Sequence, residues 1–370
     1  MISSHHSNVR RLLGSTIAAL LVSALPCAAQ VTPAAGYTPP DDTPAIRVGA
    51  TIFADYTVQQ QPKVTDVNGD SVTLNQFQVT RAYINVTGNI SHSIAFRITP
   101  DVTRETGVGS SLNGSLTYRL KYAYLQWNFD DFMTRGSWAR FGQQQTPYVD
   151  YLEGIYRYRF QGTTFEEREG FLSSSDTGAS FHYNFARNYG DLHAGVYNGE
   201  TYTRPEQNDQ KGWMFRGTVR PIPTHAILRG WRVTGFYDHD MVAKNLERKR
   251  GIFSTTFEHP YLNAGFDYLW TTDQATPTAS EADGKGWSVF LTPRSTIGWE
   301  GLLRFDHFEP DKTINGRERE RQIIGVSYWF PHQGNVSTAL LLDYDNATFD
   351  NFTPAQPKQR RIAVHALLNF

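Results

Sequence analysis

The chain of 370 residues carries 35 lysines and arginines against 36 aspartates and glutamates, which gives a formal net charge of −1. This balance argues against nucleic-acid binding, which a strongly basic domain would favour. The negative mean hydropathy and the lack of a second long apolar run exclude a helical membrane protein. They leave a β-barrel open, because barrel strands alternate between apolar and polar residues and average out polar.

The N-terminal segment has the three parts of a secretory signal peptide. Arg10 and Arg11 form a basic start, residues 12–25 form an apolar stretch, and residues 27–29 form a small-residue cleavage site before Gln30. The apolar stretch is shorter than the about 20 residues that a membrane-spanning helix needs. We therefore predict that export removes this segment.

This processing divides the chain into a signal peptide of residues 1–29, a flexible leader of residues 30–45 and a barrel of residues 46–370. The loss of two arginines changes the net charge from −1 to −3. Cys27, the only cysteine, leaves with the signal, so disulfides, thiolate catalysis and cysteine-ligated zinc are excluded. Acylation of Cys27 is the alternative, but Pro26 fits that processing poorly.

Apolar and polar residues alternate with period two through the whole predicted barrel. In the first stretch, one face is aliphatic and the other carries Arg47, Thr51 and Asp55. Such strands suit lipid on one side and water on the other, so the pattern predicts an all-β, transmembrane, antiparallel up-and-down barrel. The high aromatic content fits the aromatic girdles of such barrels. Sixteen stretches show the pattern, an even number as bacterial single-chain barrels require: 46–58, 75–88, 91–102, 116–129, 137–145, 176–186, 191–202, 212–221, 230–241, 250–258, 261–272, 284–293, 298–308, 320–330, 335–348 and 359–370.

The connections alternate between short and long, as an up-and-down barrel requires. We predict periplasmic turns at residues 188–190 and 331–334. The last strand alternates to its end at Phe370 and resembles the signal that the outer-membrane assembly machinery recognises. Longer polar connections are predicted as extracellular loops at residues 59–73, 103–115, 273–283 and 309–318.

Four pieces in the first half of the mature chain share their order and spacing with one family: Arg81–Gly88, Ala123–Leu125, Arg140–Gln143 followed by Pro147, and Phe165–Arg168. That family is the phosphate-selective porins O and P, which this chain resembles. The resemblance implies a water-filled pore in the bacterial outer membrane, in contact with the lipid bilayer and lipopolysaccharide, and a homotrimer. It does not carry over the choice of substrate, because this chain is poor in lysine.

By this resemblance, the long stretch of about residues 146–175 is an inward-folded constriction loop. It contains Arg157 and Arg159, whose guanidinium groups can hold anions through paired hydrogen bonds. It also contains Glu166, Glu167 and Arg168, and its acidic residues outnumber its basic ones. An alternative of equal weight is that these charges pair with each other or with the barrel wall and pin the loop.

Five arginines fall on predicted inward faces of the wall: Arg81, Arg97, Arg140, Arg216 and Arg220. Cations opposite loop carboxylates create a transverse field that screens solutes by charge and dipole. Because many acidic residues fall in predicted loops, we expect passive diffusion of small anionic or hydrophilic solutes with a weak to moderate anion preference. Each arginine taken singly fits equally well as a paired structural residue.

Other classes of function find less support in the sequence. An outer-membrane enzyme such as a lipid hydrolase is the main alternative, with Ser288 and His182 on strands, but nothing selects that pair. Glu166 and Glu167 are neighbours that point apart, which does not suit a glycosidase pair. No histidine spacing indicates a metal and no motif indicates a cofactor. A secreted soluble β-protein is the third hypothesis, and such a protein would not need detergent for extraction.

Overall fold

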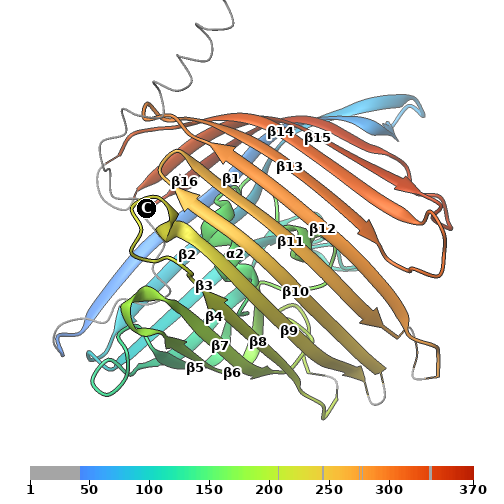
Figure 1. Cartoon of the computed structure of the whole chain (residues 1–370). Helices are drawn as coiled ribbons and strands as arrows, with labels where there is room; N and C mark the ends of the chain where they lie inside the picture. Colours follow the sequence, from blue (N-terminus) through green and yellow to red (C-terminus); the bar gives the residue numbers. More distant parts are fainter. Residues whose placement is uncertain (1–41, 207, 244–245, 275, 277, 333–335) are drawn as a thin grey trace, which may run out of the picture.

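A computed structural model describes residues 42–370 except 207, 244–245, 275, 277 and 333–335, and the backbone alone at 242–243. In this part of the chain, sixteen antiparallel strands form one closed barrel, and β16 closes the ring against β1 (Figure 1). The prediction of a sixteen-stranded up-and-down barrel is confirmed. The predicted signal peptide, residues 1–29, and residues 30–41 of the predicted leader lie outside the described residues.

The strands match the predicted stretches closely, except at the ends of a few. Their bounds are β1 Ala45–Thr65, β2 Ser71–Asn89, β3 Ile94–Arg104, β4 Leu116–Asn128, β5 Trp138–Gln145, β6 Ser175–Asn184, β7 Gly190–Tyr197, β8 Gly212–Val219, β9 Trp231–Ala243, β10 Leu246–His259, β11 Leu262–Asp273, β12 Ala282–Pro293, β13 Trp299–Glu309, β14 Glu318–Trp329, β15 Ser337–Asp350 and β16 Gln359–Asn369.

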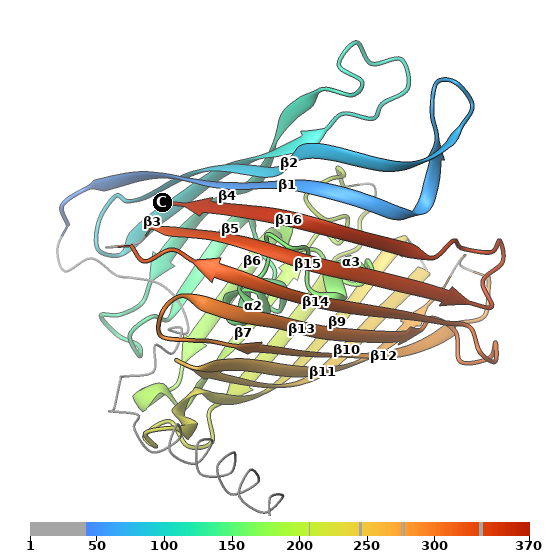
Figure 2. The same cartoon turned by 90° about the horizontal axis from the view of Figure 1, so that it is seen from above.

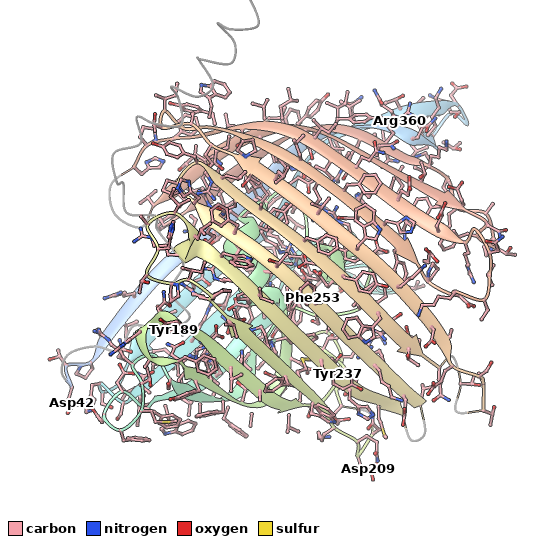
Figure 3. All side chains as sticks on the ribbon, viewed as in Figure 1. Asp42, Tyr189, Asp209, Tyr237, Phe253 and Arg360 are labelled. Carbon is pink, nitrogen blue, oxygen red and sulfur yellow. The ribbon has the colours of Figure 1, made fainter. Side chains whose placement is uncertain are left out.

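The barrel has two different rims. At the terminal rim, the amide of Phe370 donates to the carbonyl of Ala50 at 3.0 Å and joins the two ends of the sheet. The opposite rim, which we call the loop rim, carries the connections between β3 and β4, β11 and β12, and β13 and β14, where longer loops are predicted. Figure 3 shows Asp42 and Tyr189 toward the terminal rim and Arg360 and Asp209 toward the loop rim.

The loop predicted at residues 59–73 is wrong. β1 and β2 instead continue as a paired hairpin, with Val64 opposite Val72, and only residues 66–70 form the turn. Asp66 closes that turn by accepting hydrogen bonds from the amides of Asn68 and Asp70. A hairpin that extends beyond the membrane has no side in contact with lipid. Both of its faces can be polar, so residues 59–73 do not show the alternation of apolar and polar residues by which the strands were predicted. Figure 2 shows this hairpin extending past its neighbours.

The predicted turn at residues 188–190 is confirmed as the connection between β6 and β7, which contains the 3₁₀ turn η1 (Ala186–Asn188). The turn predicted at residues 331–334 lies partly outside the described residues. A second 3₁₀ turn, η2 (Leu228–Gly230), precedes β9.

The outer face of the wall is apolar, as the alternation predicts. Phe253 of β10, labelled in Figure 3, is 46% exposed, and Ile324 and Val326 of β14 and Leu342 of β15 are similarly exposed. In a soluble protein a continuous belt of such side chains would be unfavourable. In a barrel it is the surface that contacts lipid.

Two short helices lie inside the ring of strands, in the connection between β5 and β6 (Figures 1 and 2). Helix α2 (Val149–Tyr156) buries Val149, Leu152, Ile155 and Tyr156, which its periodicity places along one side. It ends at Arg157, whose positive φ of 65° stops the helix. Helix α3 (Phe165–Arg168) is a single turn. Neither helix is long and apolar enough to cross a membrane.

We call residues 146–174 the inner segment. It packs on apolar side chains that point inward from the wall. The alternation had predicted a polar inner face, so these inward apolar side chains were not expected. These wall residues lie mainly on β8 to β16: Met214, Phe236, Ile252, Leu269, Phe290, Leu302, Phe308, Ile323, Leu341 and Leu367. The hydrophobic core of the protein therefore lies within the barrel, between the inner segment and one side of the wall.

Candidate functional site

The inner segment is hydrogen-bonded to the wall along its whole length. The hydroxyl of Tyr148 donates to Asp267 on β11 at 2.8 Å, and Tyr151 contacts Thr234 on β9 at 2.9 Å. Farther along, the amide of Gln161 donates to Asp343 on β15 at 2.8 Å. These contacts hold the segment against the β9–β15 side of the lumen.

Tyr158 is the centre of the densest group of these contacts. Its hydroxyl lies 3.0 Å from a carboxylate oxygen of Glu300 and 2.8 Å from the hydroxyl of Ser327, while the indole of Trp329 donates to it at 3.4 Å. A phenol has one proton to donate and two lone pairs to accept. Donation to Glu300 and acceptance from Ser327 and Trp329 satisfy all three.

The structure places the two predicted loop arginines in ion pairs. Arg157 contacts Glu300 at 3.2 Å and covers the ring of Trp329 at 4.2 Å. Arg159 contacts Glu153 at 2.5 Å and Glu167 at 3.3 Å, both within the inner segment. Both guanidinium groups therefore have carboxylate partners that fix the shape and position of the segment.

The three charged residues of α3 have separate surroundings. Glu167 meets Arg159, whereas Glu166 is fully buried with no hydrogen-bond partner for either carboxylate oxygen. Burial opposes ionisation of Glu167, but Arg159 and Lys121 outweigh it and lower the pKa of that carboxyl. Arg168 donates to the neutral amide of Gln161 at 3.2 Å. The neighbouring glutamates thus lie in different surroundings, as expected for adjacent residues.

Glu166 makes the docking of the inner segment dependent on pH. Burial and the adjacent Asp267 raise the pKa of the Glu166 carboxyl from 4.5 to about 8. Between pH 4.5 and about pH 8, Glu166 is protonated while the inner segment is packed against the wall, but it is ionised when the segment leaves the wall and the carboxyl is hydrated. The docking free energy is therefore largest below about pH 4.5, decreases as the pH rises and levels off above about pH 8.

We expect the thermal unfolding temperature in detergent to fall between about pH 5 and pH 8, and Glu166→Gln to flatten that fall, because glutamine cannot ionise. Glu167→Gln is the control, since its carboxyl already ionises beside Arg159. Equal pH dependence in wild type and Glu166→Gln would contradict the assignment.

The wall from β2 to β5 faces the inner segment across the remaining lumen and carries its own row of cations. Arg81 pairs with Asp101 at 2.6 Å. Lys121, which the sequence did not single out, is buried beside Tyr83, with its ammonium 3.3 Å from the tyrosine hydroxyl. Lys121 and Arg81 lie close enough to Arg159 of the inner segment for their like charges to repel. The two sides of the lumen come together at this point.

Three further arginines on this wall have hydrogen bonds to neutral side chains alone. Arg97 donates to Asn85 and Thr99, and its guanidinium lies 4.5 Å from the ring of Tyr122. Arg140 donates to Gln126 and Gln145 and lies 3.8 Å from the ring of Trp138. Arg119, missed in the sequence, donates to the hydroxyl of Tyr202 at 2.9 Å. The alternation pattern by itself does not show that Arg119 points inward, because the pairing of β3 with β4 shifts register between Thr99 and Pro100.

The sequence profile of the phosphate-selective porin O and P family matches residues 46–249, more than half of the chain. The chain belongs to this family. It is therefore a porin of the bacterial outer membrane, a channel for passive diffusion. A comparison with curated protein sequences finds no match.

Solved structures of outer-membrane channels share the fold of this porin. The channel DcaP of Acinetobacter baumannii superposes with a TM-score of 0.59 at 11% identity, covering 91% of this chain and 100% of that one. The anion-selective porin from Comamonas acidovorans gives 0.59 at 9% identity, covering 89% and 100%. OmpT of Vibrio cholerae gives 0.59 at 12% identity, covering 90% and 100%.

The remaining predicted wall arginines of the porin lie in tightly packed surroundings. Arg216 is buried, pairs with Asp191 and donates to Thr218 at 2.6 Å, with its guanidinium 4.4 Å from the ring of Tyr151. Arg220 is buried just beyond β8. The structure therefore places Arg216 and Arg220 apart from the β2–β5 wall that carries Arg81, Arg97 and Arg140.

Acidic residues also lie on the strands, in addition to the many that fall in the predicted loops. Many carboxylates point inward from the strands of the porin and are almost fully buried: Asp55, Asp101, Asp176, Asp191, Asp238, Asp240, Glu258, Asp267, Glu300, Asp306, Asp343 and Asp345. Several hold a wall arginine, as in the pairs Arg304–Asp306 and Arg321–Asp345. The sequence does not show which of these pairs form. A strand residue can meet a partner two residues along its own strand, as Arg304 and Asp306 do, or one on the neighbouring strand, as Arg321 and Asp345 do.

The residues weighed for an enzyme have separate structural partners. The hydroxyl of Ser288 donates to Asp306 at 2.7 Å, while the ring of His182 lies 3.2 Å from Asp191 and stacks on Trp138. Family and fold point to a channel rather than an enzyme. Among the described residues, no group of three or more histidine or carboxylate side chains is placed to hold a metal ion.

Proposed function

We propose that this porin prefers anions weakly, phosphate-like ones included, and that they pass along the lumen between the inner segment and the β2–β5 wall. The observation that supports this path is the set of Arg97, Arg119 and Arg140. All three are partly exposed, and their hydrogen bonds go to neutral groups. Their charges act on the lumen without a carboxylate in hydrogen-bond contact to cancel them, and Asp101, which lies opposite Arg119 on β3, is paired with Arg81.

The inward carboxylates do not balance these arginines, because they are covered. Asp267 and Asp343 lie beneath the inner segment and are 1% and 2% exposed. A partly hydrated cation in a narrow lumen influences a passing ion more strongly than a charge that is already paired and buried. The expected anion preference is weak, since salt screens each charge within about 8 Å at physiological ionic strength.

The reversal potential of a planar bilayer containing the porin under a salt gradient tests this proposal. Its sign reports whether anions or cations carry more current. We expect anion preference in potassium chloride, and a reduced value at high salt because of screening. Cation preference at low salt would overturn the proposal.

In this proposal the inner segment acts as the constriction loop, and no chemical reaction occurs in the lumen. Arg159, Glu153 and Glu167 of the segment face Lys121 and Arg81 of the wall, which places opposite charges on the two sides of the passage. Opposed charges favour solutes that align their dipole with the field. Arg157 and Glu166 fix the segment rather than contact the passing solute.

We expect a homotrimer in membranes, since one related solved structure, OmpT of Vibrio cholerae with a TM-score of 0.55, is described as a trimer form. Lipopolysaccharide would surround the loop rim, and the assembly machinery would recognise the β16 strand that ends at Phe370. Cross-linking in native membranes should give a species three times the mass of the chain. Cross-linking that stops at the monomer would contradict the trimer.

A further inference from the structure

A separate cavity of about 390 Å³ opens at the loop rim, where α3 meets β14, β15 and β16. Its lining combines guanidinium groups and phenyl rings with one carboxylate, that of Glu169, and two glutamine side chains. It includes Arg168, Arg319, Arg321, Phe349, Phe352 and Gln359. The strands that form it lie beyond the part of the chain that the family profile matches. A cavity of this volume suits a small organic molecule.

The cavity carries an excess of positive charge. Arg319 contacts Glu169 at 2.6 Å, while Arg321 and Arg361 share the single carboxylate of Asp345 at 2.8 and 2.9 Å. The guanidinium of Arg168 has the neutral amide of Gln161 as its hydrogen-bond acceptor. Three guanidinium groups and one carboxylate, that of Glu169, thus line the cavity, while Asp345 and Arg361 lie just behind the lining.

Arg168 is the cation best placed to receive an anion. Its Nη1 atom is buried and has no hydrogen-bond partner. Gly162 makes room for this guanidinium, because a Cβ at residue 162 would lie 2.2 Å from Nη2 of Arg168. The guanidinium of Arg168, which has only a neutral acceptor, therefore keeps an uncompensated charge that attracts a carboxylate held in the cavity.

The opposite side of the cavity is aromatic. The rings of Phe349 and Phe352 meet edge to face, with centroids 6.0 Å apart at 81°. Arg319 lies within 6.0 Å of both ring centroids, and Arg317 covers Phe352 at 5.2 Å. Inorganic phosphate would use the guanidinium groups but leave these rings in contact with water. An aryl group would bury them.

We infer that this cavity binds small aromatic carboxylates of the size of benzoate, and that it serves as an entry site on the path to the inner segment. The carboxylate would meet Arg168 and Arg321, and the ring would pack on Phe349 and Phe352. The inference rests on the proposed anion passage but goes beyond it, since charge alone does not distinguish an aromatic anion from an aliphatic one.

Isothermal titration of the purified porin in detergent, with benzoate and acetate as probes, tests the binding. We expect saturable benzoate binding. The affinity for acetate should be lower by at least about tenfold, because acetate has no ring to bury. The double variant Phe349→Leu/Phe352→Leu should bind benzoate about tenfold more weakly and bind acetate with unchanged affinity. Phe77→Leu is the matched control, as Phe77 is 84% exposed on the β1–β2 hairpin.

A second pair of variants tests the charge. Arg168→Gln should weaken benzoate and acetate alike, whereas Arg135→Gln, at an exposed terminal-rim arginine, should change neither. Heat-dependent migration on gels confirms that each variant forms the barrel. Equal affinity for benzoate and acetate, or benzoate binding that the phenylalanine double variant retains, would overturn the inference.

Bilayer recordings separate this inference from the proposed function. Benzoate added on the loop-rim side should reduce the chloride current of the wild type, and the phenylalanine double variant should need about tenfold more. The reversal potential should not differ between these two proteins, because neither ring carries charge. Anion preference without benzoate selectivity refutes the aromatic site alone. Cation preference with selective benzoate binding refutes the proposed anion passage alone.

Discussion

The double variant Tyr156→Ala/Phe165→Ala is expected to release the inner segment and raise the single-channel conductance. Both side chains are at most 2% exposed and pack on wall residues, Tyr156 on Phe290 and Phe165 on Phe308. Removing a buried aromatic side chain costs about 3 to 5 kcal/mol, which is large compared with the hydrogen bonds that remain. The segment should then leave its position for part of the time.

Single-channel recording measures this effect directly, as a larger mean conductance and more frequent steps between levels. Phe253→Ala is the control, because it removes the same kind of side chain from the lipid-facing side of β10. The barrel should persist in both variants, since its strands close on each other without the segment. Wild-type conductance without added noise in the double variant would show that the segment does not restrict the passage.

The triple variant Arg97→Gln/Arg119→Gln/Arg140→Gln is expected to reverse the ion preference. Glutamine keeps hydrogen-bonding capacity toward the neutral partners of these arginines but removes three charges from the lumen. Because no carboxylate depends on them, no buried anion is left without a partner, and the loss of stability should be small. The reversal potential under a salt gradient should move toward cation preference.

A control with the same change of net charge shows whether position matters. Arg135, Arg187 and Arg204 are exposed near the rims, and their triple replacement by glutamine should leave the reversal potential nearly unchanged. Salt screens exposed charges at the rims far more than charges inside the lumen. An equal shift in both triple variants would assign the preference to net charge rather than to the β2–β5 wall.

Arg157 and Arg159 are less informative targets than the sequence suggested. Their replacement by alanine is still predicted to shift the reversal potential toward cations. However, it would also leave Glu153 and Glu167 without their guanidinium partner and remove one of the two that contact Glu300, the other being Arg294. A shift would therefore follow whether these arginines contact the solute or only fix the inner segment. Arg97, Arg119 and Arg140 avoid this ambiguity because their partners are neutral.

The sequence also contained a signal for the internal core that alternation alone does not explain. In strands where polar and apolar residues otherwise alternate, adjacent apolar pairs occur at Ile252–Phe253, Leu302–Leu303 and Ile323–Ile324. One member of each pair points to lipid and the other points inward, where it packs in the core. Such pairs indicate that another part of the chain covers the inner face of the wall at these positions, as the inner segment does.

The sequence by itself determined the strands and their two faces, because period-two alternation is a local property that each strand expresses independently of its partners. It also indicated the stretch that becomes the inner segment. The tertiary structure decided which charges meet. Arg81 and Arg97 look alike in sequence, yet one pairs with Asp101 and the other with neutral Asn85 and Thr99. That difference depends on strand register and barrel closure, which join residues far apart in the chain and which no local pattern encodes.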